Sequence, residues 1–189
     1  AYYDELYKLN VEVDIIELGT KKLNNYQFII APSLYSISDE DLITLNDYVK
    51  NGGSFLMIGG YLSFSGIDNK ARYGQTALAD ILPVTCINGD DREEHPEGIT
   101  PKVQMSHPAI SDLPQKWPHF LGYNKVLPKE GCPIPVTIDD DPLIAFGEFG
   151  KGKTAVFTSD CAPHWGPKEF LSWDGYDMLW KSILDYITK

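Results

Sequence analysis

The feature that most constrains the fold is a short, mostly apolar run that ends in two glycines. Ser54–Ile58 (SFLMI) has the length and composition of a buried strand, and Gly59-Gly60-Tyr61 follow at once. Glycine tolerates a tight turn, so the chain can reverse at the carboxyl end of the strand and raise the side chain of Tyr61. Ligands of α/β folds bind at this edge of the sheet. A phenol with a pKa of about 10 is a poor acyl nucleophile, so the turn predicts a reactive-site architecture without the usual reactive atom.

The segments around this strand alternate between strand and helix patterns. Phe28–Ala31 (FIIA) is typical of a short buried strand. Ser38 is the expected N-cap of a helix because three acidic residues follow it, and Gly52 is the expected end. The alternation predicts an α/β fold, a flavodoxin-like three-layer sandwich with a mostly parallel sheet in which Phe28–Ala31 and Ser54–Ile58 are neighbours. We expect a single domain over residues 1–189, a length that can bury a core.

The amino end of the chain leaves two alternatives open. Tyr2–Leu9 is typical of the end of a helix, and Val11–Leu18 of the strand that follows it. A doubly wound sheet normally opens with a strand before its first helix. Either an amino-terminal strand is missing from this sequence, or a short native helix packs on the edge of the sheet.

Three later segments have clear patterns. Gly74–Pro83 predicts one short helix, and Pro142–Phe149 with Lys153–Ser159 predicts a hairpin around a glycine-containing turn. The last helix should bury one face, whose members recur at helical spacing: Tyr176, Leu179, Trp180, Ile183, Leu184 and Ile187.

The region Val84–Leu143 differs from the rest, because it holds nine of the thirteen prolines and three of the four histidines. It predicts an irregular, partly β insertion beside the carboxyl edge of the sheet. Its acidic run Asp90–Glu94, with His95, indicates either a divalent cation site or a solvated loop, and we favour the loop. Arg92 is a candidate contact for a ligand carboxylate or phosphate. The histidines lack zinc-like spacing, so we assign no metal and no cofactor.

Charge and cysteine content argue against several function classes. With 27 acidic and 16 basic residues the net charge is −11, which opposes binding to nucleic acid or anionic membranes. No apolar run reaches the roughly 18 residues of a membrane helix. Three cysteines without a C-x-x-C pair argue against a disulfide framework and favour the cytoplasm. Four tryptophans and eleven tyrosines are compatible with a homodimer, since aromatics are enriched at interface cores, although a thick core also explains them.

Several motifs together resemble the class I glutamine amidotransferase superfamily. The turn at Gly59–Ser63 resembles its Gly-x-Cys-x-Gly elbow, and Thr158–Gly166 (TSDCAPHWG) lies where that superfamily carries its catalytic His-x-Glu. More closely, the chain resembles the glutamine amidotransferase-like proteins near the trehalose-utilisation family. The matching pieces are Gly60–Phe64, His107–Ile110, Gly147–Gly152 and Ser159–Trp165.

The departures from that family matter more than the match. Tyr61 stands where the family has cysteine, and Ser63 replaces the final glycine of the elbow. His164 remains, but Gly166 replaces the glutamate that would orient it. Glutamine hydrolysis needs the thiolate, its base and the group that orients the base, so two of three components are absent. We therefore expect no glutaminase activity.

The candidate ligand-binding residues lie at the elbow, in the insertion and in the second loop: Gly59, Gly60, Tyr61, Arg92, Asp160, His164 and Trp165. Tyr61 either donates a hydrogen bond to a ligand, which we favour, or packs over the elbow. His164 is either an acid-base group or a structural histidine, and Asp160 either orients it or caps the loop. Trp165 is a candidate for stacking on a sugar.

We expect structural roles for Cys161 and Trp173. Nothing near Cys161 is positive enough to lower its pKa, so we expect an inert buried thiol. Trp173 is expected to belong to the core rather than to a sugar site.

Two functional hypotheses remain. One is a domain that has lost its nucleophile and binds a small polar or carbohydrate-like metabolite. The other is an enzyme acting on a carbohydrate-like substrate, with His164, Asp160 and Tyr61 as acid-base groups. Asp160 within hydrogen-bond reach of His164 would favour the enzyme, whereas a shallow or filled cleft would favour the binding domain.

Both hypotheses place the site between Gly60-Tyr61 and Asp160–Trp165, because these segments follow strands whose ends should meet at one edge of the sheet. We expect Tyr61 within about 15 Å of His164, the span of a small-ligand cleft. We also expect the backbone amides of Gly59 and Gly60 to be free to receive an oxyanion or a ligand carboxylate.

Overall fold

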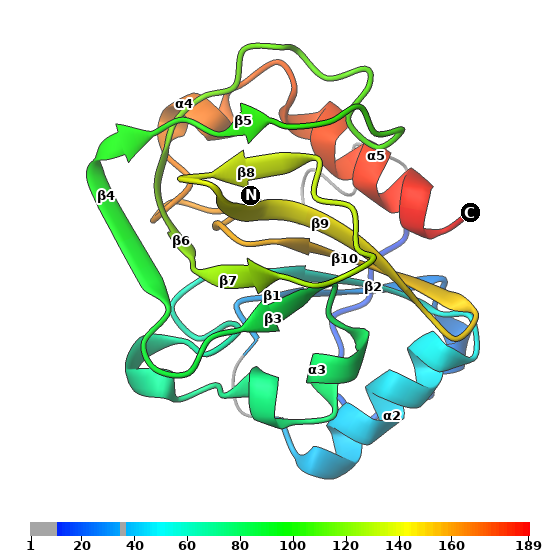
Figure 1. Ribbon diagram of the computed structural model, residues 1–189. Coiled ribbons are helices and arrows are strands. Elements are labelled where there is room, and N and C mark those ends of the chain that lie inside the picture. The colour runs from blue at the N-terminus through cyan, green and yellow to red at the C-terminus, as the bar shows by residue number, and fades with distance from the viewer. Residues whose placement is uncertain (1–10, 35–36) are drawn as a thin grey trace.

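The computed structural model describes residues 11–34 and 37–189, and its centre is a six-stranded sheet in the order β1-β2-β10-β9-β8-β5 (Figure 1). The strands are β1 (Phe28–Pro32), β2 (Ser54–Ile58), β5 (Lys102–Val103), β8 (Val136–Ile138), β9 (Asp141–Phe149) and β10 (Gly152–Phe157). β2 is parallel to both β1 and β10, while β9, β8 and β5 continue the sheet in antiparallel pairs. Four of the six strands, β1, β2, β10 and β8, therefore run in the same direction. This confirms the predicted α/β sandwich, and Phe28 pairs with Ser54 as expected of neighbouring parallel strands.

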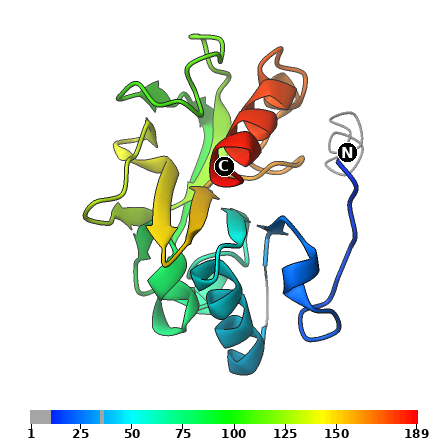
Figure 2. The same cartoon turned by 90° about the vertical axis from the view of Figure 1, so that its right-hand side faces the viewer.

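Helices cover both faces of the sheet (Figures 1 and 2). Side chains of β2 alternate between two core clusters: Leu56 and Ile58 belong to the cluster under α5 (Tyr176–Ile187), and Phe55 and Met57 to the cluster under α2 (Asp39–Lys50) and α3 (Leu78–Ile81). This alternation is the period of a strand buried on both faces. The six predicted core residues of α5 are all buried, and Ser38 caps α2 by accepting from the backbone N–H of Asp41 at 3.1 Å.

The predicted insertion forms two small antiparallel sheets. β3 (Val84–Cys86) pairs with β7 (Val126–Pro128), and β4 (Arg92–Ile99) pairs with β6 (Phe120–Asn124). The β6 end lies against the carboxyl end of β10, because the Asn124 N–H donates to the Thr158 carbonyl at 2.8 Å. The insertion therefore contributes side chains to the edge of the sheet where the elbow lies.

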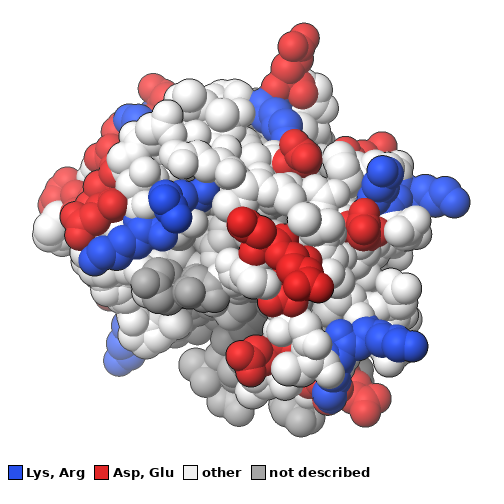
Figure 3. Space-filling view, turned by 90° about the horizontal axis from the view of Figure 1, so that it is seen from below, with Lys and Arg blue, Asp and Glu red and all other residues white. Residues whose placement is uncertain are grey.

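Three short 3₁₀ helices and one further helical turn complete the assigned elements: η1 (Leu23–Asn25), η2 (Ile67–Asn69), η3 (Tyr73–Gln75) and α4 (Lys168–Leu171). None of the helices in the described ranges is long and apolar enough to cross a membrane. Figure 3 shows a group of acidic side chains near the centre of the lower face, with basic side chains set apart from it, as the net charge of −11 leads one to expect.

Two predictions of local structure were wrong. Val11–Leu18 is not a strand: within the described ranges no strand pairs with it, and it lies along both core clusters instead. Gly74–Pro83 is not one helix, because extended backbone at Thr76 separates η3 from α3 and its hydroxyl accepts from the Leu78 N–H at 3.3 Å. The helix expected at Tyr2–Leu9 lies outside the described residues.

Candidate functional site

The strand β2 ends in the tight glycine turn that the sequence predicts. Gly59 continues the sheet by donating its N–H to the Phe157 carbonyl at 2.8 Å, and a Cβ on Gly59 would lie 2.2 Å from a carbonyl oxygen just after β10. Gly60 has φ +142°, a conformation that side-chain-bearing residues rarely adopt. The buried Ser63 hydroxyl closes the turn by donating to the Ile58 carbonyl at 2.8 Å. Glycine is therefore required at both positions, for close approach at one and for backbone conformation at the other.

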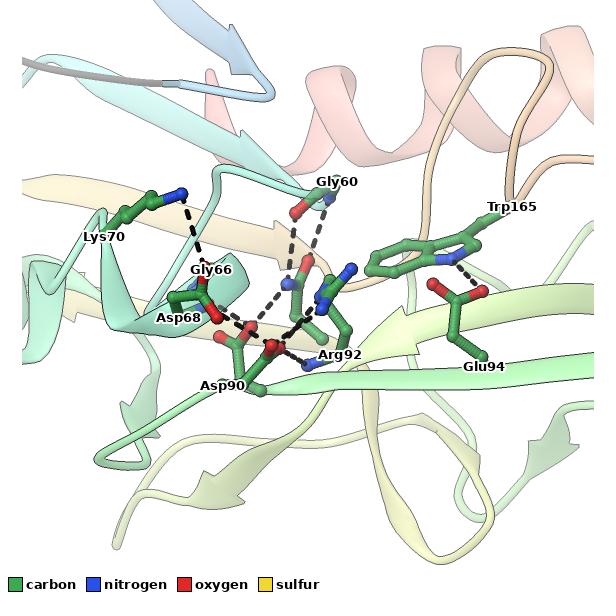
Figure 4. A network of polar contacts seen from close by, with 10 residues as sticks. Gly60, Gly66, Asp68, Lys70, Asp90, Arg92, Glu94 and Trp165 are labelled. Atoms are coloured by element: carbon green, nitrogen blue, oxygen red, sulfur yellow. Dashed lines mark hydrogen bonds and ion pairs between the residues drawn. The ribbon is translucent and has the colours of Figure 1, made fainter.

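The buried side chain of Asn124, at the end of β6, holds both sides of Gly60. Its Oδ1 accepts from the Gly60 N–H at 2.9 Å, and its Nδ2 donates to the Gly60 carbonyl at 3.1 Å and to Asp91 Oδ1 at 2.8 Å (Figure 4). The expectation of free amides was therefore wrong. The Gly59 N–H is used by the sheet and the Gly60 N–H by Asn124, so neither is available to an oxyanion without displacing a partner.

The buried carboxylate of Asp91 holds Asn124 and the backbone after the elbow in place. Its carboxylate is 1% exposed and accepts from the backbone N–H of Ser65 at 2.7 Å and of Gly66 at 3.0 Å, as well as from Asn124. Burial raises the pKa of Asp91 to about 6, although these hydrogen bonds favour the ionised form and act in the opposite direction. The prediction that the acidic run is a solvated loop was wrong, because Asp91 is buried as an acceptor for these donors and Arg92–Ile99 form strand β4.

Arg92 lies at the elbow, as expected of a candidate ligand-binding residue. Its Nε and Nη2 donate to the two carboxylate oxygens of Asp90 at 2.9 and 2.7 Å, a bidentate pair that holds the pKa of Asp90 well below its usual range. The guanidinium carbon lies 4.7 Å from the centroid of the Tyr61 ring, within cation–π distance. Asp90 thus orients the guanidinium over the raised side chain of the elbow.

The two predicted loops meet at Tyr61. Its ring centroid lies 4.2 Å from that of His164 at an interplanar angle of 89°, and 5.6 Å from that of Trp165. Tyr61 is 36% exposed, and its partner Glu94, a hydrogen-bond acceptor, raises the pKa of the phenol. The juxtaposition of Tyr61 and His164 is confirmed, but the rings are in contact, so the space where a substrate carbonyl would be attacked is occupied by side chains.

Of the two alternatives for Asp160, the contacts favour capping of the loop over orientation of His164. Asp160 Oδ2 lies 3.9 Å from His164 Nδ1, beyond hydrogen-bond distance, and Asp160 Oδ1 caps its own loop by accepting from the Ala162 N–H at 3.0 Å. Burial raises the pKa of Asp160. At the position of the family's orienting glutamate, a Cβ on Gly166 would lie 2.9 Å from the carbonyl oxygens of both Ala162 and Asp160. The loop as folded has no room for a glutamate there.

Trp165 forms the floor of the site. It is 1% exposed, its Nε1 donates to Glu94 Oε2 at 3.2 Å, and the indole covers Gly122, whose Cβ would lie 2.3 Å from Nε1. The indole therefore supports Tyr61 from within instead of offering an open face. Trp173 is partly buried and packs on Trp117 with centroids 4.9 Å apart, which confirms its assignment to the core.

Comparison with known proteins identifies the family. The model of the family described as "Putative glutamine amidotransferase" matches residues 10–189. The chain belongs to this family.

Two solved structures and one curated relative illustrate the range of similarity. Cytoplasmic protein STM3548 from Salmonella typhimurium is 39% identical with a TM-score of 0.91, over 98% of this chain and 85% of that one. A ThuA-like protein from Parabacteroides merdae ATCC 43184 shares the fold, with a TM-score of 0.68 at 12% identity over 100% of this chain and 84% of that one. β-Galactosidase BgaA from Planococcus sp. (strain 'SOS Orange') is 44% identical over 69 residues, which are 36% of this chain and 10% of BgaA. This chain therefore spans a small part of the curated relatives that it matches.

In this glutamine amidotransferase-like chain, the predicted site residues at the elbow, Arg92 and the 160–165 loop come together, but the contacts that three further residues make there were not predicted. These are Asn124, Asp91 and Glu94, all from the insertion. The sequence holds one signal for Asn124, a polar residue that ends an otherwise buried strand, FLGYN. Pairing it with Gly60 required knowledge of how the insertion folds back.

Cys161, the cysteine of the 160–165 loop, is not a candidate nucleophile. Cys161 is buried, and burial raises its pKa to about 12, which confirms the expected inert thiol. Its carbonyl oxygen accepts from the buried Tyr176 hydroxyl at 2.9 Å, which ties the loop to α5. The thiol cannot replace the missing nucleophile at neutral pH.

Proposed function

We propose that the chain is a glutamine amidotransferase-like domain without glutaminase activity that binds a small polar, carbohydrate-like metabolite at the elbow. The observation that carries this proposal is the 4.2 Å contact between the Tyr61 and His164 rings. A phenol occupies the place of the nucleophile, and the histidine that would serve as its base packs against it edge to face. The architecture retains a ligand-facing edge while the attacking atom is absent.

The groups at this edge suit a neutral, hydroxyl-rich ligand. Tyr61 is partly exposed, Glu94 is exposed, and the side chains of His164 and Arg92 are 39% and 23% exposed. They offer a phenol, an imidazole, a guanidinium and a carboxylate around one aromatic ring. Sugars present hydroxyl groups that pair with such donors and acceptors and C–H faces that pack on rings. The 69-residue similarity to β-galactosidase BgaA supports a carbohydrate-like ligand, and the name of the Salmonella protein supports a cytoplasmic location.

The competing hypothesis is an enzyme that uses Asp160, His164 and Tyr61 as acid-base groups. It requires Asp160 to orient His164, and the separation of 3.9 Å together with the Ala162 cap argues against that role. The direct contact between the rings of Tyr61 and His164 favours the binding-domain hypothesis.

Calorimetric titration with galactose, glucose, galacturonate and glutamine tests the proposal. We expect one of the sugars or the sugar acid to bind, and Arg92→Gln to weaken that binding about tenfold, because one charge-assisted contact is lost. Arg72→Gln is the matched control, since Arg72 is exposed and outside the elbow. Loss of affinity in both variants, or binding of none of the sugars, would contradict the proposal.

A parallel assay for glutamate release from glutamine tests the proposed absence of glutaminase activity. We expect no release above the uncatalysed rate. Release that His164→Ala abolishes would show that the domain is a glutaminase with another nucleophile. Hydrolysis of an aryl galactoside that the same variant abolishes would support the enzyme hypothesis instead.

A further inference from the structure

A cavity lies away from the elbow, where the sheet edge is incompletely covered. β8 pairs with β9 only as far as Ile144, and beyond that point the loop around Pro133 takes over, with the Phe146 N–H donating to the Pro133 carbonyl at 3.0 Å. Between this loop, the end of α3 and the last turn of α5 there is a cavity of about 400 Å³. That volume is within the range of small-ligand pockets.

One wall of this cavity is apolar and aromatic. Tyr186 of α5 is its partly exposed aromatic side chain and packs on the buried ring of Phe146 of β9, with ring centroids 4.9 Å apart. The buried residues Leu82 and Pro83, on the segment after α3, also line the cavity. The His107 ring stacks on Phe146 from behind at 4.4 Å, which holds that ring in place. Tyr186, supported by these buried rings, is therefore the aromatic surface on which an apolar side chain of a ligand can pack.

The charged groups of the cavity are not paired with one another. Lys153 and Glu148 are register partners on the antiparallel strands β10 and β9, so their side chains project from the same face. Among the described residues no carboxylate lies within salt-bridge distance of Lys153, whose Nζ lies 5.0 Å from the Tyr186 ring centroid. Two opposite charges thus line one cavity without neutralising each other.

The other lysine of the cavity is already engaged. Lys129 Nζ donates to the carbonyl oxygens of Ala79, Asp80 and Leu82 at 3.0, 3.1 and 2.9 Å, which caps the end of α3. Lys153 is therefore the cationic group left for a ligand, whereas the acidic residues Asp80, Glu130 and Glu148 all line the cavity. A simple anion would meet this acidic rim, and a simple amine would leave Lys153 unpaired.

We propose that this cavity binds a small zwitterion, an α-amino acid with an apolar side chain. Its carboxylate lies at Lys153, its ammonium group at Glu148, and its side chain on Tyr186. This site is separate from the elbow, and its occupancy does not depend on the function proposed there.

Three related molecules test the charge requirement by calorimetry on the intact chain. L-Leucine carries both groups, 4-methylpentanoate lacks the ammonium group and 3-methylbutylamine lacks the carboxylate. We expect leucine to bind with a Kd on the order of 0.1 mM, and each analogue to bind about tenfold more weakly. Equal affinity of the three molecules, or no leucine binding at about 10 mM, would overturn the proposal.

Variants of one hairpin locate the site. Lys153→Gln and Glu148→Gln should each weaken leucine binding about tenfold. Lys151→Gln, in the exposed turn of the same hairpin, and Arg92→Gln, at the elbow, should not change it. If Lys153→Gln does not fold, the exposed Glu148 still provides the test. Unchanged leucine affinity in Glu148→Gln overturns the assignment.

The thiol of Cys132, which lines the cavity, supplies a readout of position. We expect leucine to slow its alkylation by iodoacetamide, measured on the peptide by mass spectrometry. Leucine binding without protection of Cys132 would place the ligand elsewhere and overturn the proposal.

Discussion

Replacing Asp91 by asparagine should change how stability depends on pH. Burial raises the folded pKa of Asp91 from its ordinary 3.8 to about 6. Because the folded pKa is raised, the unfolded chain ionises first as the pH rises, and stability falls until the folded carboxyl also ionises near pH 6. A shift of about 2 units corresponds to about 3 kcal/mol, of which about 2 kcal/mol is lost between about pH 4 and pH 7.

Asp91→Asn removes this titration but also disturbs the hydrogen bonds from Ser65, Gly66 and Asn124. The lost hydrogen bonds lower stability at every pH, so the informative quantity is the difference between the two proteins as a function of pH. The free energy of unfolding of the unmodified chain minus that of Asp91→Asn should fall by about 2 kcal/mol from about pH 4 to pH 7.

Urea denaturation followed by tryptophan fluorescence, at several pH values between these limits, measures that difference. A difference that stays constant within about 0.5 kcal/mol, or that grows as the pH rises, would refute the reasoning, because the folded pKa would then be ordinary or lowered.

Two further substitutions test the turn and the loop. Asn124→Ala removes both contacts to Gly60 in a fully buried site and should lower the free energy of unfolding by about 2–4 kcal/mol. The control Asn51→Ala, on the exposed end of α2, should lower it by less than about 1 kcal/mol. Urea denaturation compares the two variants. Gly166→Ala places a Cβ 2.9 Å from the carbonyl of Ala162 and should cost about 1–3 kcal/mol, seen as a lower melting temperature. An unchanged melting temperature would show that the loop can adjust.

The sequence is most informative where a pattern is local and repeated. The i, i+3, i+4 spacing from Tyr176 to Ile187 predicts the buried face of α5 residue by residue, and the Ser38 cap marks the start of α2. Val11–Leu18 alternates apolar and polar residues as far as Ile15, yet it is not a strand. Alternation reports which side chains face the core, whereas a strand also needs a partner for its backbone, and the partner is not encoded in the segment itself.

The site shows the same limit. The elbow and the 160–165 loop could be brought together from the sequence because both follow strands whose carboxyl ends share an edge. The occupation of the Gly60 amide could not be predicted, because Asn124 lies 64 positions further along, in an insertion without regular periodicity. The acidic run was misjudged for a related reason: burial of Asp91 depends on donors from Ser65 and Gly66, which no local pattern connects to it.

The hydrogen bonds between Asn124 and Gly60 limit what a cysteine at position 61 would gain. A cysteine at position 61 would face a turn whose Gly59 and Gly60 amides are already engaged, so it would gain a thiol without their stabilisation of the oxyanion. Freeing the Gly60 amide by changing Asn124 destabilises the fold, and restoring a carboxylate at position 166 collides with the loop. Each step back is neutral or costly by itself, and only the combination is useful. The turn could stabilise an oxyanion only if positions 61 and 124 changed together.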